Sequence, residues 1–158
     1  MQQQILTHLQ ATQKLQRIAY EIAENTTLTN EITLIGLNEK GLHIAQLLQQ
    51  HLTPLGKTIT LVTAQIINNS FVINDGVTLT NKTVLLVDDV LNTGYTMAVA
   101  FAAIIPQSPA SVHLAVLVNR DHRNYCIMPN YTGISLATTL QEHITVAITN
   151  NQITATLS

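Results

Sequence analysis

Residues 84–96 constrain the fold of this chain more than any other segment does. An apolar run of strand character leads into two adjacent carboxylates and then a short polar loop: Val84-Leu85-Leu86-Val87-Asp88-Asp89-Val90-Leu91-Asn92-Thr93-Gly94-Tyr95-Thr96. Residues 97–103 are apolar or small and predict a helix directly after the loop. A buried strand that leads through a loop into a helix is the repeating unit of α/β proteins with parallel sheets.

The same segment has the chemistry to bind a sugar phosphate. Backbone N–H groups of the loop and of the helix N-terminus can hold a phosphate dianion. Thr93 and Thr96 add hydroxyl donors, and Gly94 lets the backbone approach the ligand closely. Asp88 and Asp89 can accept hydrogen bonds from ribose hydroxyls or hold a hydrated Mg²⁺. The simpler alternative is a buried strand end and a helix-start loop with no ligand.

The rest of the chain predicts one α/β domain over residues 1–158, with a mostly parallel twisted sheet flanked by helices and a C-terminal β-hairpin. In such a sheet the loops after Ile35, Val87 and Val118 meet at the carboxyl edge. We expect helices at 5–23 and 41–52, strands at 32–35, 57–67, 84–87, 111–118, 131–136 and 143–148, a hairpin of strands 71–73 and 77–79 around a turn at 74–76, and a second hairpin with its turn at 150–151.

Composition narrows the class of protein. The chain has 158 residues, of which 46% are hydrophobic and 10% charged, so it can form a real core and is not disordered. Its net charge of -2 argues against a large nucleic-acid surface. The single cysteine, Cys126, excludes an internal disulfide. With no signal-peptide pattern and no apolar run that could span a bilayer, we expect a cytoplasmic protein without a membrane partner.

The segment that contains the acidic pair resembles the phosphoribosyl-pyrophosphate (PRPP) signature of the type I phosphoribosyltransferases. The resemblance implies that Asp88 and Asp89 contact the ribose, as the catalytic pair, and share an indirectly bound Mg²⁺ cofactor. It also implies that the 5-phosphate is held by residues 92–96, which are Asn92, Thr93, Gly94, Tyr95 and Thr96. PRPP and a nucleobase or nucleotide would then be the ligands, and a homodimer the expected assembly.

A second loop, after the predicted strand 32–35, matches the place where this family binds the pyrophosphate of PRPP. Its residues are Leu37, Asn38, Glu39, Lys40 and Gly41. Relatives carry more cationic charge here, typically Lys at the position of Asn38 and Arg at that of Lys40. Lys40 is therefore the one strong pyrophosphate candidate, unless it is simply a solvated residue at a helix start.

A third loop points to one subgroup of the family, the pyrimidine-operon attenuation regulators that are also uracil phosphoribosyltransferases. Residues 114–123, 131–134 and 17–22 are similar to segments of that subgroup. The resemblance places Arg120, Asp121 and His122 beside the nucleobase, most naturally uracil, and Arg120 and Arg123 are able to pair with phosphate. The alternative is a surface cluster of basic residues.

The chain departs from the family in residues 64–82, where active members carry a flexible hood that closes over PRPP. This interval is shorter than in the relatives, contains no Arg and has Lys82 as its one cation. We expect a reduced hood or a hairpin in its place. Because cations stabilise the departing pyrophosphate, the loss raises the barrier to transfer.

Two main hypotheses follow. The first is Mg²⁺-dependent transfer of phosphoribose from PRPP to a nucleobase, most naturally uracil. The alternative is a catalytically weakened regulator of pyrimidine metabolism that binds PRPP or a nucleotide. RNA binding is a third and weaker hypothesis, because Lys14, Arg17, Arg120 and Arg123 are the few cations available for it.

Overall fold

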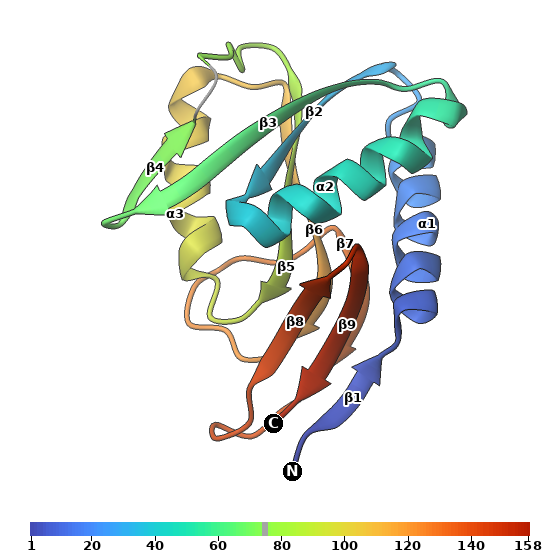
Figure 1. Ribbon diagram of the computed structural model, residues 1–158. Coiled ribbons are helices and arrows are strands. Elements are labelled where there is room, and N and C mark those ends of the chain that lie inside the picture. Colours follow the sequence, from blue (N-terminus) through green and yellow to red (C-terminus); the bar gives the residue numbers. More distant parts are fainter. Residues whose placement is uncertain (74–75) are drawn as a thin grey trace.

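A computed structural model describes residues 1–73 and 76–158, and it contains two sheets (Figure 1). The larger has six strands in the order β4-β3-β2-β5-β6-β7, and the smaller has three in the order β1-β9-β8. The elements of the larger sheet and its helices are α1 (His8–Asn25), β2 (Glu31–Leu37), α2 (Asn38–Leu52), β3 (Thr58–Ile67), β4 (Ser70–Ile73), β5 (Thr83–Leu91), α3 (Tyr95–Ile104), β6 (Ser111–Arg120) and β7 (Tyr131–Leu136). The smaller sheet consists of β1 (Gln3–Leu6), β8 (Ile144–Thr149) and β9 (Gln152–Leu157).

The larger sheet is mostly parallel, which confirms the predicted fold class. Strands β3, β2, β5, β6 and β7 pair in parallel, and only β4 on the edge runs antiparallel to its neighbour. The carboxyl ends of β2, β5 and β6 therefore lie at one edge of the sheet. This is the edge where ligands bind in open α/β sheets, and the three expected loops leave from it.

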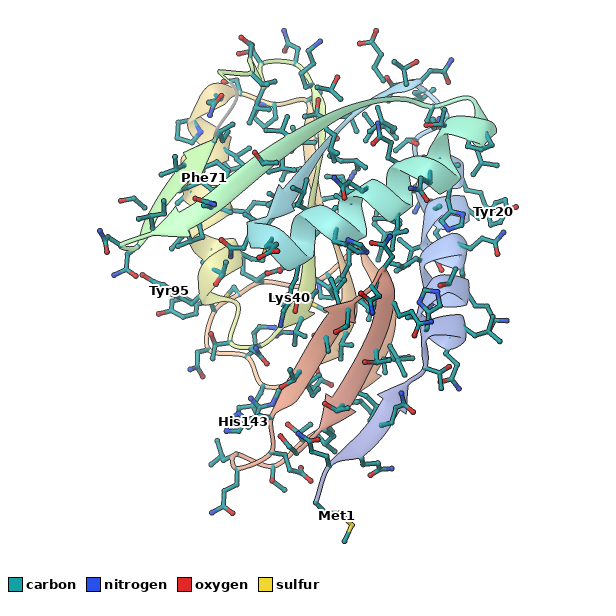
Figure 2. All side chains as sticks on the ribbon, viewed as in Figure 1. Met1, Tyr20, Lys40, Phe71, Tyr95 and His143 are labelled. Carbon is teal, nitrogen blue, oxygen red and sulfur yellow. The ribbon has the colours of Figure 1, made fainter. Side chains whose placement is uncertain are left out.

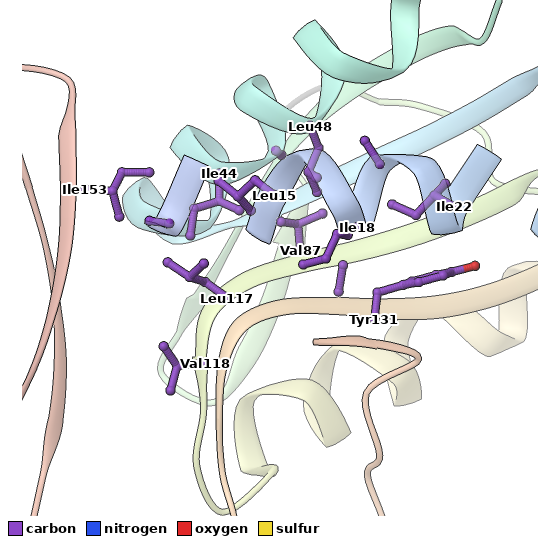
Figure 3. Close-up of a cluster of buried hydrophobic side chains, with 14 of the residues drawn as sticks. Leu15, Ile18, Ile22, Ile44, Leu48, Val87, Leu117, Val118, Tyr131 and Ile153 are labelled. Atoms are coloured by element: carbon purple, nitrogen blue, oxygen red, sulfur yellow. The ribbon is translucent and has the colours of Figure 1, made fainter. Parts of the chain in front are cut away.

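Alternating side chains of the central strands form two cores, one on each face of the sheet. On β5, Leu85 and Val87 face the cluster that includes α1 and α2 (Figure 3), whereas Val84 and Leu86 face the cluster that includes α3. Residues of β8 and β9, such as Val146 and Ile153, join the first cluster. Both faces of β5 are thus covered, which explains why its sequence is continuously apolar rather than alternating.

The start of the chain differs from the prediction. Residues 5–6 lie in β1, which pairs antiparallel with β9, and the helix begins only at His8. Thr7 is the N-cap: its hydroxyl accepts from the N–H of Gln10, and the Gln10 side chain accepts from the N–H of Thr7. This capping box fixes the helix start, although the helical spacing of apolar residues continues upstream of it. The helix runs without a break through Thr12, although the spacing of large apolar residues is interrupted between Leu9 and Leu15.

The hood region contains a hairpin, but it pairs residues 71–73 with β3 rather than with the predicted strand 77–79, and its turn falls in the polar run Asn68-Asn69-Ser70, which is itself typical of a turn. β4 folds back on β3 through Asn68 and Asn69, both of which have positive φ. Positive φ at both central residues is what a tight hairpin turn needs, and Asn tolerates it. The expected turn at 74–76 falls partly on residues 74–75, outside the described part of the chain, and residues 77–79 form no strand. The predicted turn at 150–151 is confirmed.

No helix among the described residues is both long enough and apolar enough to cross a membrane.

Candidate functional site

The acidic pair lies inside β5, because this strand runs on to Leu91 rather than ending at Val87 as predicted. The N–H of Asp89 donates to the carboxylate of Asp88 at 2.9 Å. Burial, together with the neighbouring Asp89 carboxylate, raises the pKa of Asp88 well above its ordinary value, and Lys40 partly opposes this shift. A carboxylate in this state gains from an additional cation or a hydroxyl donor, and both are features of a metal-bound sugar phosphate.

The predicted pyrophosphate loop meets the acidic pair. The first turn of α2 packs on the end of β5 so closely that a Cβ at Gly41 would lie 2.7 Å from the carbonyl oxygen of Val87. Only glycine allows this approach, which places Lys40 close enough to Asp88 to affect its pKa. Figure 2 shows Lys40 at the start of α2, on the side of the end of β5. The structure therefore brings these two predicted groups together.

The rest of that loop carries no further positive charge. Leu37 is buried, Glu39 is exposed, and Asn38 adopts a φ of 57°. The side-chain oxygen of Asn38 is 3.4 Å from the N–H of Ile66, which lies on β3. A cavity of about 310 Å³ opens between this loop and β3, and Gln65 is one of its lining residues.

The predicted phosphate loop, residues 92–96, surrounds a small cradle. A cavity of about 60 Å³ is lined by Asp88 and by every residue from 90 to 97. That volume suits one small anion or a few waters. Gly94 has a φ of 88° and caps the N-terminus of α3, and the N–H of Tyr95 lies 3.3 Å from the Thr93 hydroxyl. Backbone donors, hydroxyls and a helix N-terminus meet at this cradle, as an anion site requires.

Residues 119–127 brace the phosphate loop, a feature that the sequence analysis missed. The N–H groups of Asn124 and Tyr125 both donate to the carbonyl of Thr93, at 2.9 and 3.1 Å. The Arg123 guanidinium donates to the carbonyl of Asn92, and Ile127 packs against Gly94. The tilted ring contact between Tyr95 and Tyr125 joins the same two segments. The one sequence signal was the cationic Arg123, which suggested a phosphate contact rather than a contact with the loop.

Arg120 lies within β6 instead of in the loop after it, and its side chain is only 8% exposed. Its guanidinium donates to the hydroxyl of Thr138 at 2.6 Å and to the carbonyl of Thr139 at 2.9 Å. It therefore anchors the connection between β7 and β8. Asp121 is exposed and His122 half-buried at the carboxyl end of β6. These two side chains remain the candidates for a nucleobase contact.

Asp88 and Asp89 are the donors that the sequence predicts for a metal ion. Among the described residues, no group of three or more His, Cys, Asp or Glu side chains is arranged to hold a metal. Mg²⁺ in phosphate-transfer sites is commonly held by one or two carboxylates together with the phosphates of the substrate. Asp88 and Asp89 fit that arrangement, in which the metal arrives with the ligand.

Comparisons with known proteins agree with this geometry. Residues 1–146 match the model of the phosphoribosyl transferase domain family. The chain is 34% identical over 156 residues to the bifunctional protein PyrR of Streptococcus pneumoniae strain CGSP14, covering 92% of this chain and 90% of the relative. PyrR proteins of other strains of that species, such as G54, match equally well.

Solved structures share the fold at lower sequence identity. A hypoxanthine-guanine phosphoribosyltransferase from Bacillus anthracis superposes with a TM-score of 0.81 at 17% identity, over 100% of this chain and 99% of that one. The hypoxanthine phosphoribosyltransferase of Trypanosoma cruzi gives 0.79 at 15% identity, over 85% and 81% of the two chains. With a family match over most of its length and a relative of this similarity, the chain belongs to the type I phosphoribosyltransferases.

Proposed function

We propose that this protein binds PRPP and transfers its phosphoribosyl group to a nucleobase, with uracil as the first candidate. The observation that carries the proposal is the arrangement at one edge of the sheet: the 60 Å³ cradle, the acidic pair and Lys40 follow one another there. A 5-phosphate, a ribose and a pyrophosphate occur in that order in PRPP. The naming of the relative as the bifunctional PyrR supports a pyrimidine base.

In this mechanism residues 92–96 hold the 5-phosphate and fix the position of the ribose. Asp88 and Asp89 accept hydrogen bonds from the ribose hydroxyls, and their negative charge favours the cationic ribose that forms as the bond to pyrophosphate breaks. The nucleobase nitrogen then forms the new bond to the anomeric carbon as the bond to pyrophosphate breaks, and its proton passes to water. Asp88 and Asp89 would hold a Mg²⁺ that arrives with PRPP, and this ion would neutralise charge on the departing pyrophosphate.

Lys40 is the residue of this chain that stabilises the leaving group. It stands at the start of α2 beside the end of β5, and it is exposed, so its ammonium group is free to reach a pyrophosphate bound next to the acidic pair. The neighbouring Glu39 opposes it by adding a negative charge. Leaving-group stabilisation by this loop therefore depends on a single cation, Lys40.

A second candidate function is regulation by nucleotide or PRPP binding with little or no turnover. The observation in its favour is the β3–β4 hairpin, because residues 58–81 contain neither Lys nor Arg. A site that keeps its phosphate cradle and lacks a cationic hood binds the ligand but accelerates the reaction less.

The experiment that separates the two is pyrophosphate release from Mg²⁺-PRPP with a panel of nucleobases, with the product masses read from the same tubes. Base-dependent release and a matching nucleotide mass are expected for the enzyme. The double variant Asp88→Asn/Asp89→Asn is the control and should lose turnover while staying folded. Tight nucleotide binding without release would favour the regulator, and full activity of the double variant would contradict the catalytic assignment.

A further inference from the structure

The brace on the phosphate loop gives Arg123 a specific role. We infer that Arg123 is a positioning residue, which fixes the peptide groups of residues 92–94 so that their N–H groups face the ligand, and that it does not itself bind the phosphate. The inference deepens the proposed function, on which its ligand depends.

The contacts of the guanidinium support this role, because it donates to three acceptors within the protein. Nη1 donates to the carbonyls of Asn92 and Arg120, the latter at 3.3 Å, and Nη2 donates to the side-chain oxygen of Asn119 at 2.5 Å. Arg123 is half-buried, and its Cδ lies against Gly94. A guanidinium held at three points has a fixed orientation, which a flexible surface arginine lacks.

The orientation of two peptide planes follows from these contacts. In a trans peptide the N–H points opposite to the C=O. The carbonyl of Asn92 is held by Arg123, and that of Thr93 by the N–H groups of Asn124 and Tyr125. The N–H groups of Thr93 and Gly94 therefore point away from the brace.

The described residues that line the cradle include 92–97 but none of the bracing residues 119–127. The cradle therefore lies across the phosphate loop from the brace, which is the direction in which N–H groups pointing away from the brace are aimed. If either peptide flipped, a carbonyl oxygen would face the phosphate and repel it. Anion binding therefore requires that both carbonyls stay turned away from the cradle. Because the brace already orders the loop in the free protein, ligand binding loses less conformational entropy.

The brace also joins two parts of the site. Arg123 follows Asp121 and His122, the remaining candidates for the nucleobase contact, and its Nη1 also bonds to the carbonyl of Arg120, just before them. A change at Arg123 is expected to weaken phosphate binding first, since its contacts outside residues 119–123 are with Asn92 and Gly94 of the phosphate loop.

Lysine distinguishes positioning from a charge effect. Arg123→Lys keeps the positive charge but cannot bridge three acceptors in the same plane. Arg123→Met removes the charge as well. If Arg123 positions the loop, both variants lose about ten- to a hundredfold in affinity for ribose 5-phosphate, as for other contacts that orient a binding group. If it acts by charge, the lysine variant binds almost as well as the wild type.

The experiment is a ribose 5-phosphate titration followed by amide NMR, with hydrogen exchange at the Asn124 and Tyr125 amides measured on the same samples. We expect faster exchange at both amides in Arg123→Lys, together with the lost affinity. Lys14→Met, which removes a cation on α1 outside the cradle, is the matched control and should leave both readouts unchanged.

Asn119→Ala provides a second variant if Arg123→Met fails to fold. It removes one acceptor of the guanidinium without altering any charge, and it should reproduce part of the effect; combined with Arg123→Lys it should add little. Wild-type affinity and exchange in Arg123→Lys would overturn the inference. A wild type that does not bind ribose 5-phosphate would contradict the proposed function, and the exchange rates would still decide whether Arg123 holds the loop.

Discussion

The two ends of the candidate site are built differently. At the phosphate end, residues 92–96 are fixed by the N-terminus of α3 and by the hydrogen bonds from residues 123–125. At the pyrophosphate end, Lys40 is an exposed cation on the first turn of α2, next to Glu39, and the neighbouring hairpin contributes no positive charge. One end is supported by many mutually dependent contacts, whereas the other depends on one side chain.

This difference separates binding from catalysis. Phosphate contacts act equally on the bound substrate and on the transition state, so they set affinity. Cations at the pyrophosphate act mainly as the leaving group gains charge, so they set the rate. Under the proposed function the phosphate end therefore governs the affinity for PRPP and the pyrophosphate end governs the rate, and each end predicts a different kinetic effect on mutation.

The largest effect is expected for Lys40→Met. Removing one charged donor to a developing anion typically lowers kcat by about 100- to 1000-fold. Affinity for ribose 5-phosphate, which has no pyrophosphate, should stay unchanged. Steady-state kinetics with PRPP and a titration with ribose 5-phosphate test both statements, and Lys40→Arg is the control that keeps the charge. An unchanged kcat would show that Lys40 does not serve the leaving group.

Sequence reasoning found the fold and the loops that meet at one edge of the sheet because strand–loop–helix patterns are local. The apolar run of β5, the acidic pair and the Thr-Gly motif lie within one short segment, and parallel pairing then brings the loops to one edge. The brace could not be found in this way. It depends on Asn124 and Tyr125 reaching the carbonyl of Thr93, about thirty residues earlier in the chain, through backbone groups that every residue type carries.

The second largest effect is expected for Gly94→Ala at the phosphate end. The φ of 88° is strained for alanine, and its Cβ would lie 3.1 Å from Cδ of Arg123 and 3.2 Å from Cβ of Ile127. We expect a loss of about 1–3 kcal/mol in the free energy of unfolding and a clear loss of ribose 5-phosphate affinity.

Gly56→Ala is a matched control for this prediction. Gly56 has nearly the same φ, 85°, but a Cβ there would meet no atom within 4 Å. Gly56→Ala should lower the free energy of unfolding by the backbone strain alone, about 1 kcal/mol, and it should leave the affinity for ribose 5-phosphate unchanged. Equal effects of the two substitutions on stability and binding would mean that the contact with the brace is unimportant. Urea unfolding measures the free energy of unfolding, and the ribose 5-phosphate titration measures the affinity.

Local patterns also misplaced two features through competition with tertiary contacts. The sequence predicted that strand 71–73 pairs with residues 77–79, yet residues 71–73 pair with β3 across the turn at Asn68-Asn69, which places Phe71 against the core that includes α3. Arg120 was expected in a loop beside the base, but β6 extends through it and its guanidinium binds Thr138 and Thr139. A strand end is decided by the partner strand as much as by its own residues.

A smaller effect, in the opposite direction, is expected from adding a cation to the hairpin. Gln65 is exposed on β3 and lines the cavity beside Asn38 and Glu39. Gln65→Arg should raise kcat by about two- to fivefold, the value of one exposed charge contact. Gln65→Glu should lower it by a similar factor, and neither should alter ribose 5-phosphate affinity. If kcat responds to neither substitution, the charge on the β3–β4 hairpin does not influence the reaction at the pyrophosphate end.

The smallest effect is on stability and concerns Asp88, which stands between the two ends. Its pKa is raised in the folded protein above the ordinary 3.8, chiefly by burial, so the fold binds this proton more tightly than the unfolded chain does. The stability from this group is complete below pH 3.8 and is lost as the pH rises through the raised pKa. Asp88→Asn carries no charge at any pH and keeps an oxygen that can accept from the N–H of Asp89.

The variant should therefore unfold at a higher temperature than the wild type at neutral pH, and the difference should shrink as the pH falls. Thermal unfolding across a pH series measures it. A difference that is independent of pH would mean that the ionisation of Asp88 is not its cause. Adding Mg²⁺ and PRPP should also reduce this difference in unfolding temperature, by raising that of the wild type. The reason is that a cation and hydroxyl donors at Asp88 stabilise its charged form. The carboxylate that weakens the empty fold is then the group that the ligand uses, so the acidic pair lowers the stability of the empty fold and ligand binding offsets that loss.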